Sequence, residues 1–110
     1  MKEPLYYSEK DALVTATYLA ELKVFEQLIS EGADLNCQDE IGQTPLHAAA
    51  DRGDTELAQR LLYLGAVPNV KDIDGDTPLD VALFREHAEI AALLESIGAR
   101  SHAHLPAREP

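Results

Sequence analysis

Apolar residues recur along this chain at helical spacing, in short blocks that come in pairs. Each pair ends in a Gly-Ala dipeptide, and the glycines Gly32, Gly65 and Gly98 are evenly spaced along the chain. Polar segments rich in Asp, Asn and Gly, residues 34–43 and 67–76, follow the first two pairs and are too broken for a helix. A fixed period of this length is typical of stacked repeats, in which no unit can bury its apolar face alone. The pattern therefore predicts three helix pairs joined by two projecting turns or short hairpins.

The first pair of blocks lies in residues 11–33 and predicts a helix, a break and a second helix. The apolar face of the first helix comprises Leu13, Val14, Ala16 and Thr17. The face of the second comprises Leu22, Val24, Phe25, Leu28 and Ile29. Residues 1–10 and 100–110 lack a helical period, so we interpret them as a short lead-in and a flexible tail.

The middle unit has the clearest start and stop signals. Thr44 can cap the first helix with its hydroxyl, and Pro45 suits the first helical position because its missing N–H would have no partner there. Gly53 then breaks this helix before the second one begins. In the third unit Glu86 stands in place of Gly53, so we expect a less marked break between those two helices.

Charge narrows the range of partners. The chain has 110 residues, enough for one domain, and 45% of them are hydrophobic, which suits a folded chain. Its formal net charge is −11. Nucleic acids and anionic membranes are poor partners for such a chain, because both are bound mainly through Lys and Arg. A neutral or basic protein partner fits better.

The remaining composition indicates a reducing compartment. Cys37 is the single cysteine, which excludes an intramolecular disulfide, and we expect it to be an exposed free thiol in a turn. The first residues lack the pattern of a secretory signal, and no run reaches the roughly 18 apolar residues of a membrane span. We therefore expect a monomeric protein of the cytoplasm.

One motif makes the repeat specific. Thr-Pro-Leu-His at residues 44–47 recurs one period later as Thr-Pro-Leu-Asp at residues 77–80. Asp39 and Gly42 recur at the same interval as Asp72 and Gly75. Over residues 11–99 the sequence resembles ankyrin repeats, whose pattern is Thr-Pro-Leu-His-x-Ala.

The resemblance implies an all-α solenoid of three stacked helix-turn-helix units with projecting β-turn or hairpin loops. The repeats would cover approximately residues 11–38, 39–71 and 72–99. The first unit lacks Thr-Pro and the third has Asp80 where the second has His47, so both resemble capping repeats.

The resemblance also implies a non-enzymatic protein-interaction module, an adaptor or inhibitor that binds a partner through its concave face. The side chains that the repeat leaves free for binding are Tyr18, Glu40, Ile41, Gln43, Asp51, Arg52, Ile73, Asp74, Asp76, Phe84 and Arg85. The alternative interpretation is that these residues are ordinary solvated surface. A more specific alternative function is an immunity or accessory protein that masks the surface of a basic enzyme.

His47 is the first residue that could suggest catalysis. The resemblance places it at the family's structural histidine position, where it is expected to hydrogen-bond the neighbouring turn. A catalytic base would need a second reactive group beside it, and none recurs there in the pattern. His87 lies at a helix start, and we expect it only to tolerate the surface. We therefore expect no catalytic residue and no cofactor.

A calcium-linked module is the second alternative, because Asp72, Asp74 and Asp76 form the sequence Asp-x-Asp-Gly-Asp. A calcium-binding hand needs Gly at its sixth position and Glu at its twelfth, and neither is present here. The repeat itself explains Asp72, so we favour a structural role for this sequence. His102 and His104 are too few for a tetrahedral site of about four ligands, so we expect no metal.

Overall fold

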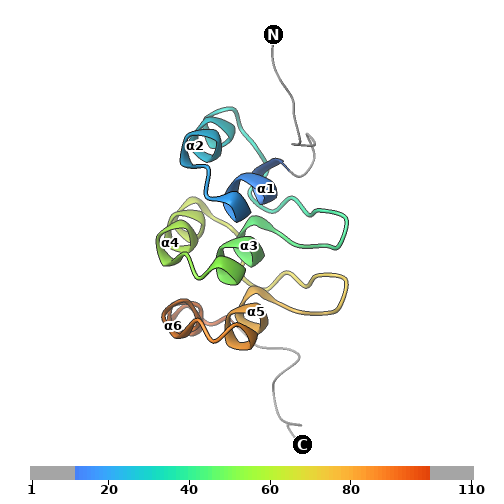
Figure 1. Cartoon of the computed structure of the whole chain (residues 1–110), viewed down its shortest axis with the longest axis vertical. Coiled ribbons are helices and arrows are strands. Elements are labelled where there is room, and N and C mark those ends of the chain that lie inside the picture. The colour runs from blue at the N-terminus through green and yellow to red at the C-terminus, as the bar shows by residue number, and fades with distance from the viewer. Residues whose placement is uncertain (1–11, 100–110) are drawn as a thin grey trace, which may run out of the picture.

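The computed structural model describes residues 12–99 and forms six helices there (Figure 1). The helices are α1 (Ala12–Leu19), α2 (Leu22–Ser30), α3 (Pro45–Arg52), α4 (Thr55–Leu64), α5 (Pro78–Phe84) and α6 (Ala88–Ser96). Within residues 12–99 there is no β-strand, so the two projecting loops are turns rather than strand hairpins. The lead-in at 1–10 and the tail at 100–110, with His102 and His104, lie outside the described residues.

The helices form two columns (Figure 1). An inner column contains α1, α3 and α5, with α3 in contact with both of the others, and an outer column contains α2, α4 and α6. Residues 34–43 and 67–76 form loops that project from the side of the inner column. This arrangement confirms the predicted stack of three helix-turn-helix units.

Local signals start α3, as predicted, and α5 in the same way. The Oγ1 atoms of Thr44 and Thr77 each accept a hydrogen bond from the backbone N–H three residues later, at 3.3 Å. In return, Nδ1 of His47 accepts from the Thr44 N–H at 3.1 Å, and Oδ2 of Asp80 accepts from the Thr77 N–H at 2.9 Å. These are reciprocal capping boxes, and Pro follows each Thr.

The His47 ring also joins two units. Because Nδ1 accepts from Thr44, Nε2 carries the ring proton and donates it to the carbonyl oxygen of Asp76, 2.8 Å away in the next loop. The side chain is fully buried, and burial lowers its pKa below the usual value, against an opposing effect of the Asp76 hydrogen bond and nearby carboxylates. His47 therefore has the structural role that its sequence position implied.

All three inner helices end in the same way. Ala20, Gly53 and Glu86, which are equivalent positions of the three units, have positive φ angles of 56°, 75° and 63°. In each case the following N–H bonds back to the carbonyl five residues earlier, as His87 N–H does to Ala82 O at 2.8 Å. The expectation of a weaker break at Glu86 was wrong, because this turn is imposed by the return of the chain along the stack and is strained in a non-glycine residue.

Glycine has a second role at the middle turn. A Cβ atom on Gly53 would lie 2.7 Å from Nδ1 of His87 in the third unit. The side chain of Glu86, at the equivalent position in the third unit, is exposed. At the middle turn Gly therefore avoids both the strain of the left-handed angle and a clash with the His87 ring.

The core uses small residues between the inner helices and larger ones toward the outer column. Ala16, Ala49 and Ala82 are fully buried and allow the inner helices to approach closely. Phe25, Leu61, Ile90 and Leu94 fill the space around the outer helices. The predicted face of α2 is partly wrong: Phe25 is buried, but Leu22 is 57% exposed because it begins the helix at its outer edge.

Replacement of Leu61 by Ala should lower the free energy of unfolding by about 2 to 5 kcal/mol, because it leaves a cavity among fully buried side chains. Denaturant titration followed by circular dichroism measures this change. Tyr63→Ala on the same helix is the matched control, since Tyr63 is 85% exposed and its loss should change stability by no more than about 0.5 kcal/mol. Equal effects of the two substitutions would contradict the placement of α4.

Glu86→Gly should raise the free energy of unfolding by about 0.5 to 1 kcal/mol, because the left-handed strain at this turn is removed. Relief of that strain gains about 1 to 2 kcal/mol, and the added freedom of Gly in the unfolded chain offsets part of it. Denaturant titration measures the change. Gln59→Gly, on the exposed side of α4, should instead lower stability by about 1 kcal/mol. A destabilised Glu86→Gly protein would show that the strain at this turn is absent.

Stability should decrease with acid in a window set by His47. Its folded pKa lies below its unfolded value, so the unfolded chain binds the proton first as the pH falls. The free energy of unfolding should be at its full value above about pH 6.5 and fall below that by at most about 1.4 kcal/mol per pH unit. Denaturant titrations between about pH 7.5 and 5.5 measure the slope, and His47→Gln should flatten it. A slope unchanged in His47→Gln would contradict this assignment.

Candidate partner-binding groove

Two hollows lie side by side between the inner helices and the projecting loops. The first, of about 390 Å³, lies mainly along α1 and the tip of the first loop, and its lining includes Tyr18, Leu19 and Ile41. The second, of about 370 Å³, lies between the second loop and α5, and its lining includes Asp74 and Phe84. Both are also lined by Gln43, Asp51 and Arg85. Together they form one continuous concave surface, which we call the groove.

The repeat places equivalent side chains in register along this groove. Tyr18, Asp51 and Phe84 occupy the same repeat position near the ends of α1, α3 and α5. The loop tips are joined by a backbone hydrogen bond from Ile73 N–H to Ile41 O at 2.9 Å. Since both walls are fixed by contacts between units, the groove is a preformed feature of the stack.

An ion pair stands where the two hollows meet. Nε of Arg85 donates to Oδ1 of Asp51 at 2.6 Å, and the Arg85 guanidinium lies 5.7 Å from the centre of the Phe84 ring. The Arg85 side chain is 53% exposed, so the pair contributes little to stability. Its effect is to fix the Arg85 side chain and to neutralise Asp51.

Asp39 and Asp72, at equivalent positions of the two loops, build the turns. Oδ1 of Asp39 accepts from the N–H groups of Ile41 and Gln43, and Oδ1 of Asp72 accepts from those of Asp74 and Asp76 in the same pattern. These bonds are 2.8 to 3.1 Å long. The repeat of one geometry in both loops explains why Asp recurs at these positions.

The second loop also brings together the three carboxylates of the calcium alternative. One ligand oxygen from each of Asp72, Asp74 and Asp76 can lie within 4.8 Å of the other two. Asp72 already uses Oδ1 in the turn, as Asp39 does in the first loop, where no such triad stands. The turn geometry therefore accounts for Asp72, and the cluster gives this end of the groove a high density of negative charge.

Most of the residues predicted to bind a partner converge on the groove. Those that line it are Tyr18, Ile41, Gln43, Asp51, Asp74, Asp76, Phe84 and Arg85. Glu40, Arg52 and Ile73 lie outside the two hollows. Nη1 of Arg52 donates to the carbonyl oxygen of Tyr18 at 3.0 Å, so this side chain ties the first two units together. Ile73 is 70% exposed on the second loop.

His87 joins the third unit to the second, a role that the sequence did not predict. It was expected to tolerate the surface, but its half-buried ring packs against Gly53, and Nε2 lies 3.1 Å from the carbonyl oxygen of Asp51. This contact holds the end of α3, and with it Asp51, against the third unit. A glycine at the facing position in the middle unit was the available signal, because it left room for a ring from the next unit.

The outer column has its own contact between units, remote from the groove. Arg60 donates twice to Glu26, at 2.7 and 3.0 Å, and this hydrogen-bonded pair lowers the pKa of Glu26. Both side chains are exposed, so the pair aligns α2 and α4 without contributing much to stability. Among the described helices, none is long and apolar enough to cross a membrane.

Comparison with known families agrees with this architecture. A family model described as ankyrin repeats matches residues 13–103 in three copies, while a search of curated proteins gave no match. Ankyrin repeats are in general modules for protein–protein interaction and typically have no enzymatic activity. The matched region covers most of the chain and contains nearly all of the six helices and both loops. The chain therefore belongs to the ankyrin-repeat family.

Proposed function

We propose that this protein is a small acidic adaptor or inhibitor that binds one protein partner along the groove, without enzymatic activity. The observation that carries this proposal is the clustering of exposed apolar side chains in a preformed concavity. Tyr18 is 49% exposed, Ile41 51% and Phe84 71%, and all three line the groove. Exposed apolar clusters rimmed by polar groups are typical of interaction sites.

The residues of the framework and those of the groove are different, and this separation supports the proposal. The residues that cap the inner helices, Thr44, His47 and Asp80, are buried and use their polar atoms within the framework, and His47 also bonds to the next loop. The side chains of Tyr18 and Phe84 instead line the groove and contribute little to the core. Aromatic residues of this kind are frequent anchors in protein interfaces.

The charge of the chain indicates what kind of partner surface would bind in the groove. The net charge of −11 and the loop carboxylates favour a neutral or basic protein surface over nucleic acid or an anionic membrane. An immunity or accessory protein that masks a basic enzyme is one form of this function, with the same groove as its contact. We propose that the protein binds as a monomer, since its acidic surface opposes self-association.

A random 12-residue peptide display library selected on the full chain provides a probe for the groove. Peptides enriched on the wild-type protein should bind Phe84→Ala at least ten-fold more weakly, because a buried aromatic anchor contributes about 1.4 kcal/mol or more. Fluorescence anisotropy with the synthetic peptides measures the affinities.

Tyr63→Ala is the matched control for this experiment, because Tyr63 is also a strongly exposed aromatic residue but lies on the outer helix α4. It should retain wild-type affinity, and both variants should unfold within about 0.5 kcal/mol of the wild type. Peptides that depend on Tyr63, or on neither residue, would argue against the groove as the binding site. A large loss of stability in Phe84→Ala would place that residue in the core instead.

A further inference from the structure

The two hollows of the groove differ in chemistry. We infer that the partner segment carries one apolar side chain, which enters the first hollow, and one cationic side chain, which enters the second. This inference rests on the proposed function, since it names the partner chemistry of the same groove. It commits to a basic, apolar protein segment lying along the stack from α1 to α5.

In the first hollow the described charges are already committed. Oδ1 of Asp39 accepts two backbone hydrogen bonds of its own loop, and Asp51 is paired with Arg85 at 2.6 Å. The side chains left to meet a partner are Tyr18, Leu19 and Ile41, which are 49%, 46% and 51% exposed. An apolar partner side chain would bury these surfaces without leaving a charge unpaired.

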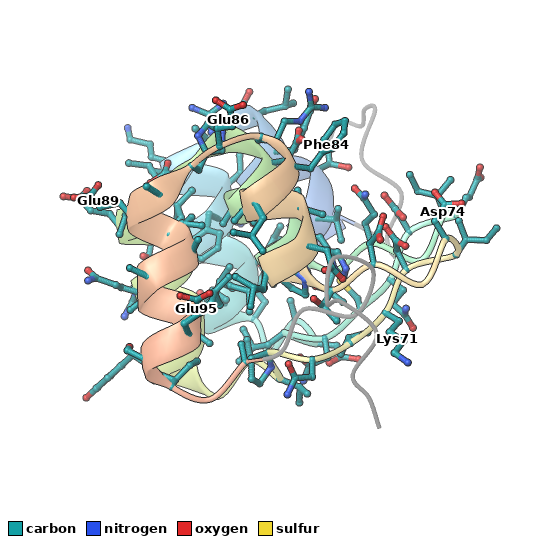
Figure 2. The ribbon with its side chains drawn as sticks, turned by 90° about the horizontal axis from the view of Figure 1, so that it is seen from below. Lys71, Asp74, Phe84, Glu86, Glu89 and Glu95 are labelled. Carbon is teal, nitrogen blue, oxygen red and sulfur yellow. The ribbon has the colours of Figure 1, made fainter. Side chains whose placement is uncertain are left out.

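In the second hollow negative charge is in excess. Five aspartates line it against two in the first hollow, and Arg85, already paired with Asp51, is the one Lys or Arg among its described lining residues. Asp72 accepts backbone hydrogen bonds as Asp39 does, and Asp80 caps α5, so the carboxylate that meets a partner is that of Asp74. Asp74 is exposed on the loop wall, and Phe84 is 71% exposed on the helix wall. Figure 2, which views the stack from below, shows Asp74 on the projecting loop and Phe84 at the end of α5, on the same side of the molecule.

A cation fits between these walls better than any other group. It would meet the exposed carboxylate of Asp74 on the loop, and its apolar stem would cover part of the exposed Phe84 ring, whose centre already lies 5.7 Å from the Arg85 guanidinium. A neutral apolar side chain would instead have to desolvate the exposed Asp74 carboxylate without supplying an opposite charge. The excess of carboxylates over cations in this hollow thus selects for Lys or Arg.

The stack also sets the distance between the two partner groups. Adjacent packed helices are about 8 to 10 Å apart, and α3 lies between α1, which lines the first hollow, and α5, which lines the second. The apolar and cationic side chains should therefore lie between one and two helix spacings apart, roughly 8 to 20 Å, on one face of the partner segment. This geometric condition separates a groove ligand from a peptide that is merely basic.

The test uses the peptides selected from the random 12-residue library on the wild-type protein. These peptides should be enriched in sequences that combine Lys or Arg with a large apolar residue. Asp74→Asn should weaken binding of such a peptide at least five-fold. The same peptide with its cationic residue changed to Gln should be insensitive to Asp74→Asn, as expected when the two groups interact directly.

Glu89→Gln is the matched control, because it removes the same charge from α6, on the side of the molecule opposite the loops in Figure 2. It should weaken the affinity for the peptide less than two-fold. Equal effects of Asp74→Asn and Glu89→Gln would overturn the inference, because they would show attraction by net charge alone.

The possible failures are distinguishable. Selected peptides that depend on Phe84 or Tyr18 but contain no required cation would overturn the cation subsite and leave the proposed function intact. Dependence on Asp74 without any effect of Tyr18→Ala would overturn the apolar subsite in the first hollow. Selected peptides that depend on none of these groove residues would overturn the proposed function together with the inference.

Discussion

Each helix pair of this protein can bury its apolar face only against a neighbouring pair, and the other features of the structure follow from that constraint. The inner helices approach closely because alanines such as Ala49 and Ala82 separate them, with no exposed area left on these residues. Close approach brings polar groups of adjacent units within hydrogen-bonding distance. The buried ring of His47 uses this proximity, since it caps its own helix and donates to the Asp76 carbonyl of the next unit. One side chain thus couples local helix formation to the stacking of units.

The same constraint explains where the units differ from one another. Gly53 lies beneath the His87 ring of the third unit and has no room for a Cβ atom, whereas the equivalent Glu86 is exposed and accepts the same strained backbone angle. At the start of α5, a carboxylate oxygen of Asp80 takes the capping role that Nδ1 of His47 has in α3. The sequence of each unit therefore reflects the surface that it packs against as well as its own helices.

A framework that satisfies its polar groups internally leaves a separate set of residues available for recognition. The groove is made of side chains from the inner helices and the two loops, and its walls are held by contacts between units such as the Arg85–Asp51 pair. Groove residues can change without loss of the stack, because stability depends on buried residues elsewhere. The first hollow is mainly apolar and the second acidic, so the chemistry of the groove changes along the stack.

The sequence by itself determined the architecture of the protein and most of the residues that line the groove. Period, capping residues and the Thr-Pro-Leu-His motif are local signals, and stacking of identical backbones places equivalent positions in register, so residues left free by the repeat had to converge. Tertiary structure alone decided the rest. The turn at Glu86 forms against local preference because the chain must return along the stack, and Arg52 and His87 each bond to a residue of the preceding unit. Such contacts depend on side-chain reach between neighbouring units, which periodicity along one chain does not encode.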